Sequence, residues 1–254
     1  MHNLGQTRSS QHRNHLLLTP DTFVRTILPG MEACAGIVHA GPALGAAFTQ
    51  YTAEFEAGGE LGPTDAQRFL YVIEGAVSLE LGGKRSELGG KRSELVERGY
   101  AYVPQGLPHR VVAGKASRVS VIEKPYLALE SAGSPQAIVA TEDSIEAHPL
   151  NDDPDLQVKC LLPDQVNFDF AVNTMLYQPG AALSMVEMHV MEHGLIMLEG
   201  GGIYRLGDSW YPVTAGDFIW MGPWCPQWFG AIGKVPAKYL IYKDWNRHPL
   251  PGVR

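Results

Sequence analysis

A carboxylate and two imidazoles are spaced closely enough in the second half of this sequence to share one metal ion. Glu187 and His189 are two residues apart and His193 follows, between Gly180 and Gly200. Because side chains two residues apart on a strand point to the same face, Glu187 and His189 can face a common centre. Carboxylate oxygen and imidazole nitrogen together suit Mn(II), Fe(II), Co(II) or Zn(II). The alternative is that they are ordinary polar residues of a surface or core, and the glycine-bracketed spacing favours a metal.

A later segment carries groups that could bind a substrate or move a proton. Tyr239, Ile241 and Lys243 alternate along one expected strand and therefore share a face. If that face points inward, a phenol and an ammonium lie near the metal, where the ammonium could hold a substrate carboxylate or act in proton transfer. Tyr204, on the expected strand after Gly200, is a third candidate. A lysine at a strand end is usually solvated, so the assignment of Lys243 depends on the neighbouring metal site.

Short apolar segments of strand length must position these side chains. They are rich in β-branched and aromatic residues, and Gly, Pro and Asp separate them. The segments are 69–73, 76–81, 100–103, 119–122, 195–198, 202–206, 217–220 and 239–242. The 254 residues include 28 Gly and 18 Pro, which suits many short strands joined by turns. The sequence therefore predicts an all-β barrel or sandwich.

The expected strands occur in two copies with the same order of strands and turns. The copies begin near Phe69 and Leu195, and a separation of roughly 120 residues suits a duplicated small β domain. Pro-rich and Asp-rich sequence between them reads as a linker, and the polar start reads as a flexible tail. We expect a tail over 1–16, a first barrel over 17–133, a linker over 134–166 and a second barrel over 167–254.

This two-copy pattern resembles the bicupin family, whose domains are small double-stranded β-helix (cupin, jelly-roll-like) barrels. The cupin pattern has a first motif with His-x-His and Glu, and a second motif that ends in His. In the second copy Glu187, His189 and His193 keep this spacing with permuted residues, and Gln227 stands at the usual His position. The resemblance therefore implies a metal site made of Glu187, His189, His193 and Gln227.

The first copy lacks most of this pattern. Gln67, Arg68 and Phe69 stand where His-x-His would be, and His109 alone matches the second motif. An isolated imidazole is more often a core or surface residue than a ligand. We therefore expect the first barrel to be metal-free and to serve packing and assembly.

The second copy, with the segments 161–180 and 239–250, is more closely similar to the (S)-ureidoglycine aminohydrolase family of bicupins. The similarity runs from about Leu17 to Leu250. It implies a hydrolase that releases ammonia from (S)-2-ureidoglycine and leaves (S)-ureidoglycolate in purine (allantoin) degradation. It also implies Mn(II), with other divalent ions compatible, on the four ligands. The implied catalytic residues are Tyr204, Tyr239 and Lys243, which bind substrate together with Glu187 and Gln227.

Two other functions fit a cupin with this site. An Fe(II) dioxygenase would consume oxygen, although such sites usually keep more His or a facial triad. A non-catalytic binding bicupin would hold a small molecule without turnover and with less than about one metal per chain. Ammonia release that depends on metal and not on oxygen separates the aminohydrolase from both.

Composition limits the partners and the compartment. The net charge of −7 argues against nucleic acid or an anionic membrane as the main partner. No segment approaches the roughly eighteen apolar residues that span a bilayer, and residues 1–16 do not read as a secretory signal. Three cysteines without a Cys-x-x-Cys pattern indicate a reducing compartment. We expect a cytoplasmic enzyme for a small-molecule substrate, and the bicupin resemblance implies a homo-oligomer.

One tandem repeat stands apart from the rest of the sequence. The heptapeptide LGGKRSE at 81–87 is copied at once at 88–94, where a hairpin loop is expected. It could form a basic ligand-binding loop, or it could be a duplication tolerated at an exposed tip. Because extra loop length costs little, we favour the tolerated duplication.

Overall fold

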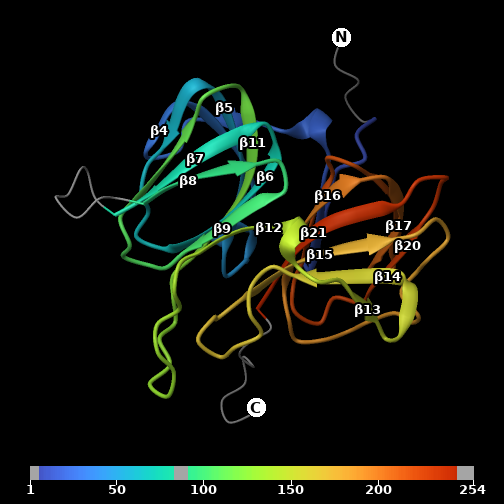
Figure 1. Ribbon diagram of the computed structural model, residues 1–254. Helices are drawn as coiled ribbons and strands as arrows, with labels where there is room; N and C mark the ends of the chain where they lie inside the picture. The colour runs from blue at the N-terminus through green and yellow to red at the C-terminus, as the bar shows by residue number, and fades with distance from the viewer. Residues whose placement is uncertain (1–5, 83–90, 245–254) are drawn as a thin grey trace. The chain divides into compact units, whose positions relative to one another are not determined.

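The computed structural model describes residues 6–82 and 91–244, and the chain divides into two compact units (Figure 1). The first unit is Val24–Ile145. The second unit combines Glu146–Arg254 with Met1–Phe23. Strands dominate both units, so the all-β prediction is confirmed. In the described ranges, the only helical elements are three short 3-10 turns, η1 (Pro20–Thr22), η2 (Pro42–Leu44) and η3 (Glu142–Ser144).

The first unit is built on a ten-stranded sheet. Eight strands follow the order β12-β9-β6-β11-β5-β10-β7-β8, while β4 pairs with β5 and β3 pairs with β4. The long strand β5 pairs with β4, β10 and β11, and the apolar faces of these strands enclose one core. The strands are β3 (Arg25–Thr26), β4 (Met31–Ala40), β5 (Thr49–Leu61), β6 (Gln67–Glu74), β7 (Ala76–Leu81), β8 (Lys91–Val96), β9 (Gly99–Val103), β10 (His109–Ala113), β11 (Ser117–Lys124) and β12 (Ile138–Thr141).

The second unit contains an eight-stranded and a three-stranded sheet. The larger sheet has the order β1-β2-β19-β16-β21-β15-β14-β13, and the smaller has the order β18-β17-β20. Side chains from both sheets form a single apolar core. The strands are β1 (Ser10–Gln11), β2 (His15–Leu18), β13 (His148–Leu150), β14 (Asp153–Cys160), β15 (Ala171–Tyr177), β16 (His193–Glu199), β17 (Gly201–Leu206), β18 (Ser209–Thr214), β19 (Phe218–Met221), β20 (Gln227–Ala231) and β21 (Ala237–Lys243).

The matching Glu-Gly turns of the two copies have a common physical cause. Gly75 and Gly200 both have left-handed backbone, with φ of 86° and 61°, which glycine adopts without a steric penalty. A Cβ on Gly200 would also collide with the carbonyl of Pro236, and one on Gly75 would collide with Ser117. Each turn therefore needs glycine, which explains why the dipeptide marks the same connection in both copies, β6 to β7 and β16 to β17.

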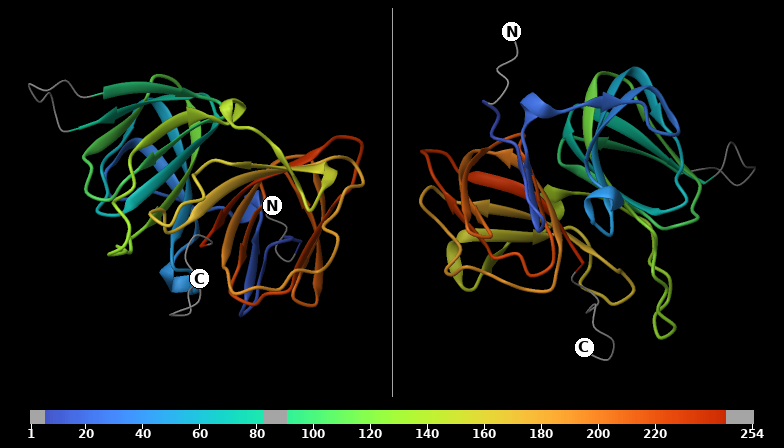
Figure 2. Two further views of the ribbon diagram at one scale, coloured as in Figure 1. Left: turned by 60° about the horizontal axis from the view of Figure 1, so that its bottom comes forward. Right: turned by 180° about the vertical axis from the view of Figure 1, so that it is seen from behind.

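The expected tail over 1–16 is wrong for the residues that the structure describes. Residues 10–11 and 15–18 form β1 and β2, and β2 pairs with β19 of the second unit (Figure 2). Arg8 also forms an ion pair with the fully buried carboxylate of Asp217. The segment reads as a tail because it is polar, yet its polar groups have partners far along the chain.

The expected linker over 134–166 also contains strands of both units. Strand β12 pairs with β9 and extends the first sheet, whereas β13 and β14 join the second sheet. The boundary between the units therefore falls at residues 145–146. Several prolines and aspartates of this stretch lie within these strands, Pro149 in β13 and Asp153, Pro154 and Asp155 in β14, so the stretch is not an unstructured connection.

Three sequence expectations concern other parts of the chain. Strands β7 and β8 form an antiparallel hairpin whose last pair is Leu81 and Lys91. The tandem repeat begins at the end of β7 and ends within β8, and its residues 83–90 lie outside the described part of the chain. Cys34, Cys160 and Cys225 are all free. Among the described residues, no helix is long and apolar enough to cross a membrane.

Candidate metal centre

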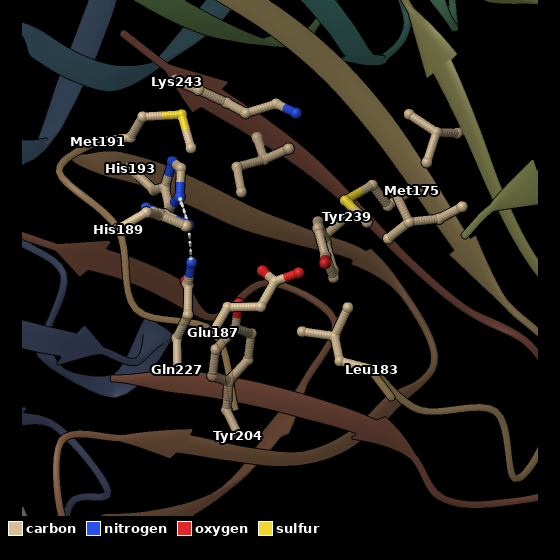
Figure 3. Close-up of a pocket in the computed structure, with 13 residues that line it drawn as sticks. Met175, Leu183, Glu187, His189, Met191, His193, Tyr204, Gln227, Tyr239 and Lys243 are labelled. Atoms are coloured by element: carbon tan, nitrogen blue, oxygen red, sulfur yellow. Dashed lines mark hydrogen bonds between the residues drawn. The ribbon is translucent and has the colours of Figure 1, made fainter. Parts of the chain in front are cut away.

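A cavity of about 300 Å³ lies inside the second unit, and all seven candidate site residues line it (Figure 3). Its walls combine apolar side chains with imidazole, carboxylate, amide, phenol and ammonium groups. Such a mixture of convergent polar groups and apolar surface is typical of small-molecule sites. The lining residues are Leu150, Val158, Met175, Leu183, Glu187, His189, Met191, His193, Tyr204, Gln227, Tyr239, Ile241 and Lys243.

Backbone pairing places Glu187 directly opposite Gln227. The Glu187 N–H donates to the Gln227 carbonyl at 2.8 Å, and the Gln227 N–H donates back at 2.9 Å. His189 is held by the N–H of Trp224, which donates to its carbonyl at 2.7 Å. These backbone hydrogen bonds hold the segment that carries Glu187 and His189 against the segment that carries Gln227, so the two motifs lie side by side.

The two histidines face each other through Nε2. Nδ1 of His193 lies 3.2 Å from the Tyr242 carbonyl, to which it can only donate, and this leaves Nε2 free of a proton. That Nε2 is 3.3 Å from Nε2 of His189. Burial lowers the pKa of His189, and it lowers the pKa of His193 well below its usual value. Both imidazoles are therefore held in the neutral form that binds metals.

These distances fit a shared cation. Two nitrogens that each lie about 2.1 Å from one ion, at right angles, are about 3 Å apart. The amide nitrogen of Gln227 is 2.7 Å from Nε2 of His189. Oε1 of Gln227 is buried and has no hydrogen-bond partner in the described part of the chain. Rotation of the amide by 180° would place this oxygen beside the imidazoles as a third donor.

The Glu187 carboxylate does not join these three groups. It lies beside Tyr239, while the imidazoles and the Gln227 amide form a separate cluster (Figure 3). Within residues 6–82 and 91–244, no three His, Cys, Asp or Glu side chains are grouped closely enough to hold one ion. Burial raises the pKa of Glu187, and the charge of Lys243 opposes this effect. A four-donor site therefore requires the Glu187 side chain to rotate toward the histidines.

Lys243 extends into the cavity from the end of β21, opposite His193 on β16. Tyr239, Ile241 and Lys243 all line the cavity, so their shared face does point inward. Burial lowers the pKa of Lys243, while nearby acidic groups, Glu187 among them, oppose the shift. With the Asn173 amide oriented to satisfy both of its ends, its oxygen accepts a hydrogen bond from Lys243 Nζ at 2.9 Å. The sequence analysis missed Asn173, and its place on the inward face of a strand is the only local signal.

Three buried phenols lie together beneath the cavity. Tyr204 and Tyr239 line it, as expected, and the hydroxyl of Tyr239 is 2.7 Å from that of Tyr177. Burial raises the pKa of all three well above the usual value, and the Glu187 carboxylate adds to the effect. All three hydroxyls are therefore protonated and can donate hydrogen bonds. The sequence analysis missed Tyr177 because its partner is 62 residues away.

Comparison with known proteins now gives the family. A family model described as a cupin domain matches residues 173–242, within the second unit. The chain is 40% identical to the (S)-ureidoglycine aminohydrolase of Arabidopsis thaliana, over 97% of this chain and 80% of that protein. It is 32% identical to the (S)-ureidoglycine aminohydrolase of Escherichia coli, over 93% of this chain and 90% of that protein. This chain belongs to the (S)-ureidoglycine aminohydrolase family.

The fold comparison agrees with the family. The crystal structure of protein Ylba from E. coli has a TM-score of 0.84 and 30% identity, and the match covers 98% of both chains. The expectations of a cupin fold and of a hydrolase are therefore confirmed. A non-catalytic binding bicupin is not supported, because the family consists of enzymes.

In this (S)-ureidoglycine aminohydrolase family member, an arginine lies beside the one cupin-motif histidine of the first unit. Arg68 is 2% exposed, and its guanidinium lies 2.8 Å from Nε2 of His109. It also donates to the carbonyl of Gly62 and pairs with Glu123, which accepts a further bond from Tyr51. His109 thus has a local structural partner. The expectation of a metal-free first barrel stays a prediction, and this network supports it.

Proposed function

We propose that this chain is a metal-dependent enzyme that hydrolyses (S)-2-ureidoglycine to ammonia and (S)-ureidoglycolate, a step of purine (allantoin) degradation. One observation carries the proposal. Two neutral imidazoles, an amide, a carboxylate, an ammonium and two phenols line one cavity, in a chain whose relatives bear that name. A site with these groups can bind a small, polar, anionic molecule and move protons on it.

We propose that Glu187, His189, His193 and Gln227 hold Mn(II), with other divalent ions compatible. The facing Nε2 atoms and the buried Oε1 of Gln227 support this set. A mixture of oxygen and nitrogen donors without sulfur suits such an ion. When bound, the ion would supply Lewis acidity and a template for the substrate.

The side chains that line the cavity would determine which of the two nitrogens leaves. The reacting carbon carries an amine, a ureido nitrogen, a carboxylate and a hydrogen, and either nitrogen can leave. The ammonium of Lys243 would bind the carboxylate or carry a proton, and the hydroxyls of Tyr204 and Tyr239 would orient the ureido group. With the carbon held in this way, water would form a C–O bond from one face as the C–N bond to the amine breaks, and the proton that the water gives up would pass to the leaving nitrogen, which departs as ammonia.

Ammonia release from freshly prepared ureidoglycine, with chiral analysis of the product, tests the proposal. We expect release that requires added Mn(II) or a related ion and continues without oxygen, with (S)-ureidoglycolate as product. His193→Ala should lose both the ion and the activity, whereas His148→Ala, at an exposed position of β13, should keep both. Oxygen consumption would indicate a dioxygenase instead, and release that is indifferent to metal would contradict the assigned ligands.

The assembly and the compartment stay predictions of the sequence. We propose a homo-oligomer in the cytoplasm that acts on a small molecule, without a nucleic-acid or membrane partner. Sedimentation of the purified full chain tests the oligomer, and a monomer at micromolar concentration would contradict it.

A further inference from the structure

We propose that Tyr177 is a positioning residue, whose hydroxyl aims the hydroxyl of Tyr239 into the cavity. This inference rests on the proposed function, in which Tyr239 contacts the substrate. Tyr177 itself does not line the cavity, and its side chain is fully buried on β15. It would therefore act only through Tyr239.

The contact between the two phenols is short and enclosed. Their hydroxyl oxygens are 2.7 Å apart, and both side chains are buried. A buried phenol hydroxyl without a hydrogen bond is costly, so each hydroxyl requires its partner. The Tyr239 hydroxyl therefore cannot turn away from Tyr177 without loss of stability.

The rings leave these hydroxyls little freedom. Phe229 packs edge-on against both rings, with centroid distances of 4.9 Å to Tyr177 and 5.7 Å to Tyr239. On the paired strands, Tyr177 is opposite the small residue Ala237, and Met175 is opposite Tyr239. Tyr177 and Tyr239 are therefore diagonal neighbours on the paired strands, and the small side chain of Ala237 leaves space for Tyr177 to reach Tyr239. Packing fixes the rings, and the one rotation left is that of each hydroxyl hydrogen.

The direction of that hydrogen decides what Tyr239 offers to a ligand. A hydroxyl has one hydrogen to donate and two lone pairs to accept. When Tyr177 donates to Tyr239, the hydrogen of Tyr239 remains for a molecule in the cavity, and when Tyr239 donates to Tyr177, its oxygen is left to accept from that molecule. A phenylalanine at 177 would fill the same volume, but it would remove this constraint.

The test is a double-mutant cycle on the metal-loaded full chain, with ammonia release as the signal. The variants are Tyr177→Phe, Tyr239→Phe and the double variant. We expect Tyr177→Phe to lower kcat about ten-fold, with KM within about two-fold. Because Tyr177 acts only through Tyr239, the double variant should be no slower than Tyr239→Phe alone.

A matched control separates positioning from stability. Tyr102 in the first unit is equally buried, and its hydroxyl donates to Gln67 Oε1 at 2.7 Å. Tyr102→Phe should lower the unfolding midpoint about as much as Tyr177→Phe and leave kcat unchanged.

Different results would overturn different statements. Full activity in Tyr177→Phe, losses that multiply in the double variant, or an equal loss of kcat in Tyr102→Phe would each overturn the positioning role while the proposed function stands. A wild-type chain that releases no ammonia would overturn the proposed function and this role with it.

Discussion

Lys243 is the positive charge in a cavity whose histidines are held neutral. It lies opposite His193 on the neighbouring strand and hydrogen-bonds Asn173 behind it. Its pKa is lowered by burial, an effect that the Glu187 carboxylate opposes. These contacts hold the ammonium where a substrate carboxylate would need it, and this makes Lys243 the most informative residue to change.

Replacement of Lys243 by methionine should abolish turnover and leave the metal content unchanged. Methionine has similar bulk but no charge, and loss of a positioned proton donor or carboxylate partner costs about a hundred-fold or more in rate. Ammonia release and elemental analysis of the same sample check both expectations. Lys238→Met is the control, because Lys238 lies on the same strand in the opposite phase and pairs with Glu199. Unchanged turnover in Lys243→Met would refute the assignment.

His39 makes the stability of the first unit depend on pH. It is buried and lies 2.8 Å from the hydroxyl of Thr52, and burial lowers its pKa to about 3. The unfolded chain, with a histidine pKa of about 6.5, binds a proton below that pH that the folded chain does not. Stability from this residue is therefore complete above about pH 6.5 and is lost as the pH falls toward 3.

His39→Gln should flatten this dependence. One proton corresponds to about 1.4 kcal/mol per pH unit. Between pH 6 and pH 4, the unfolding free energy of the wild type should therefore fall by about 1.4 kcal/mol per pH unit more than that of His39→Gln. Urea unfolding followed by circular dichroism measures it, while tryptophan fluorescence follows the second unit, which contains every tryptophan of the chain. Parallel slopes in the two proteins would contradict the prediction.

At the scale of elements, the N-terminal segment is part of the barrel that holds the site. β2 pairs with β19, and the carbonyl of Asn14 accepts the N–H of Gly222, where the chain turns toward Gln227. The Arg8 guanidinium makes two bonds to the buried Asp217 carboxylate, the longer of them 2.8 Å. The segment therefore supports the turn that presents one of the proposed ligands.

Arg8→Ala should destabilise the second unit by about 1–2 kcal/mol. Its loss leaves a buried carboxylate with fewer partners, while the partial exposure of Arg8 moderates the effect. Tryptophan fluorescence during urea unfolding reports this unit alone. Arg25→Ala, which breaks the more exposed pair with Glu54 in the first unit, should leave this fluorescence transition unchanged. Equal and small effects of both variants would contradict a structural role for the segment.

At the scale of the whole molecule, the two units repeat one fold but differ in the side chains of their interiors. In the second unit the cupin motifs meet at an open cavity with neutral donors. In the first unit Arg68, His109 and Glu123 satisfy one another. A guanidinium beside the imidazole supplies positive charge and leaves no unpaired lone pair for a cation.

This difference predicts about one bound ion per chain. Elemental analysis of the manganese-loaded protein should give a ratio near one, which should persist in His109→Ala and disappear in His193→Ala. The reason is that the second unit offers neutral imidazoles that face each other, whereas His109 faces a guanidinium. A ratio near two, or loss of the ion in His109→Ala, would show that the first unit binds metal.

Local patterns in the sequence by themselves determine much of this protein. All eight segments predicted as strands coincide with strands, one of them with an offset of a single residue, because alternation and flanking turns are properties of a few adjacent residues. The period of two also places Tyr239 and Lys243 on one inward face. The spacing of the two cupin motifs brings Glu187, His189, His193 and Gln227 to the same cavity.

Only the tertiary structure decides the contacts between distant strands. Tyr177 meets Tyr239, Asn173 meets Lys243, and Arg8 meets Asp217 because strand register and packing place them together. The same holds for strand β2 near the polar start of the chain, which is recognisable only from its pairing with β19. Local sequence does not identify the partners in such contacts, since each partner is brought by folding from another part of the sequence.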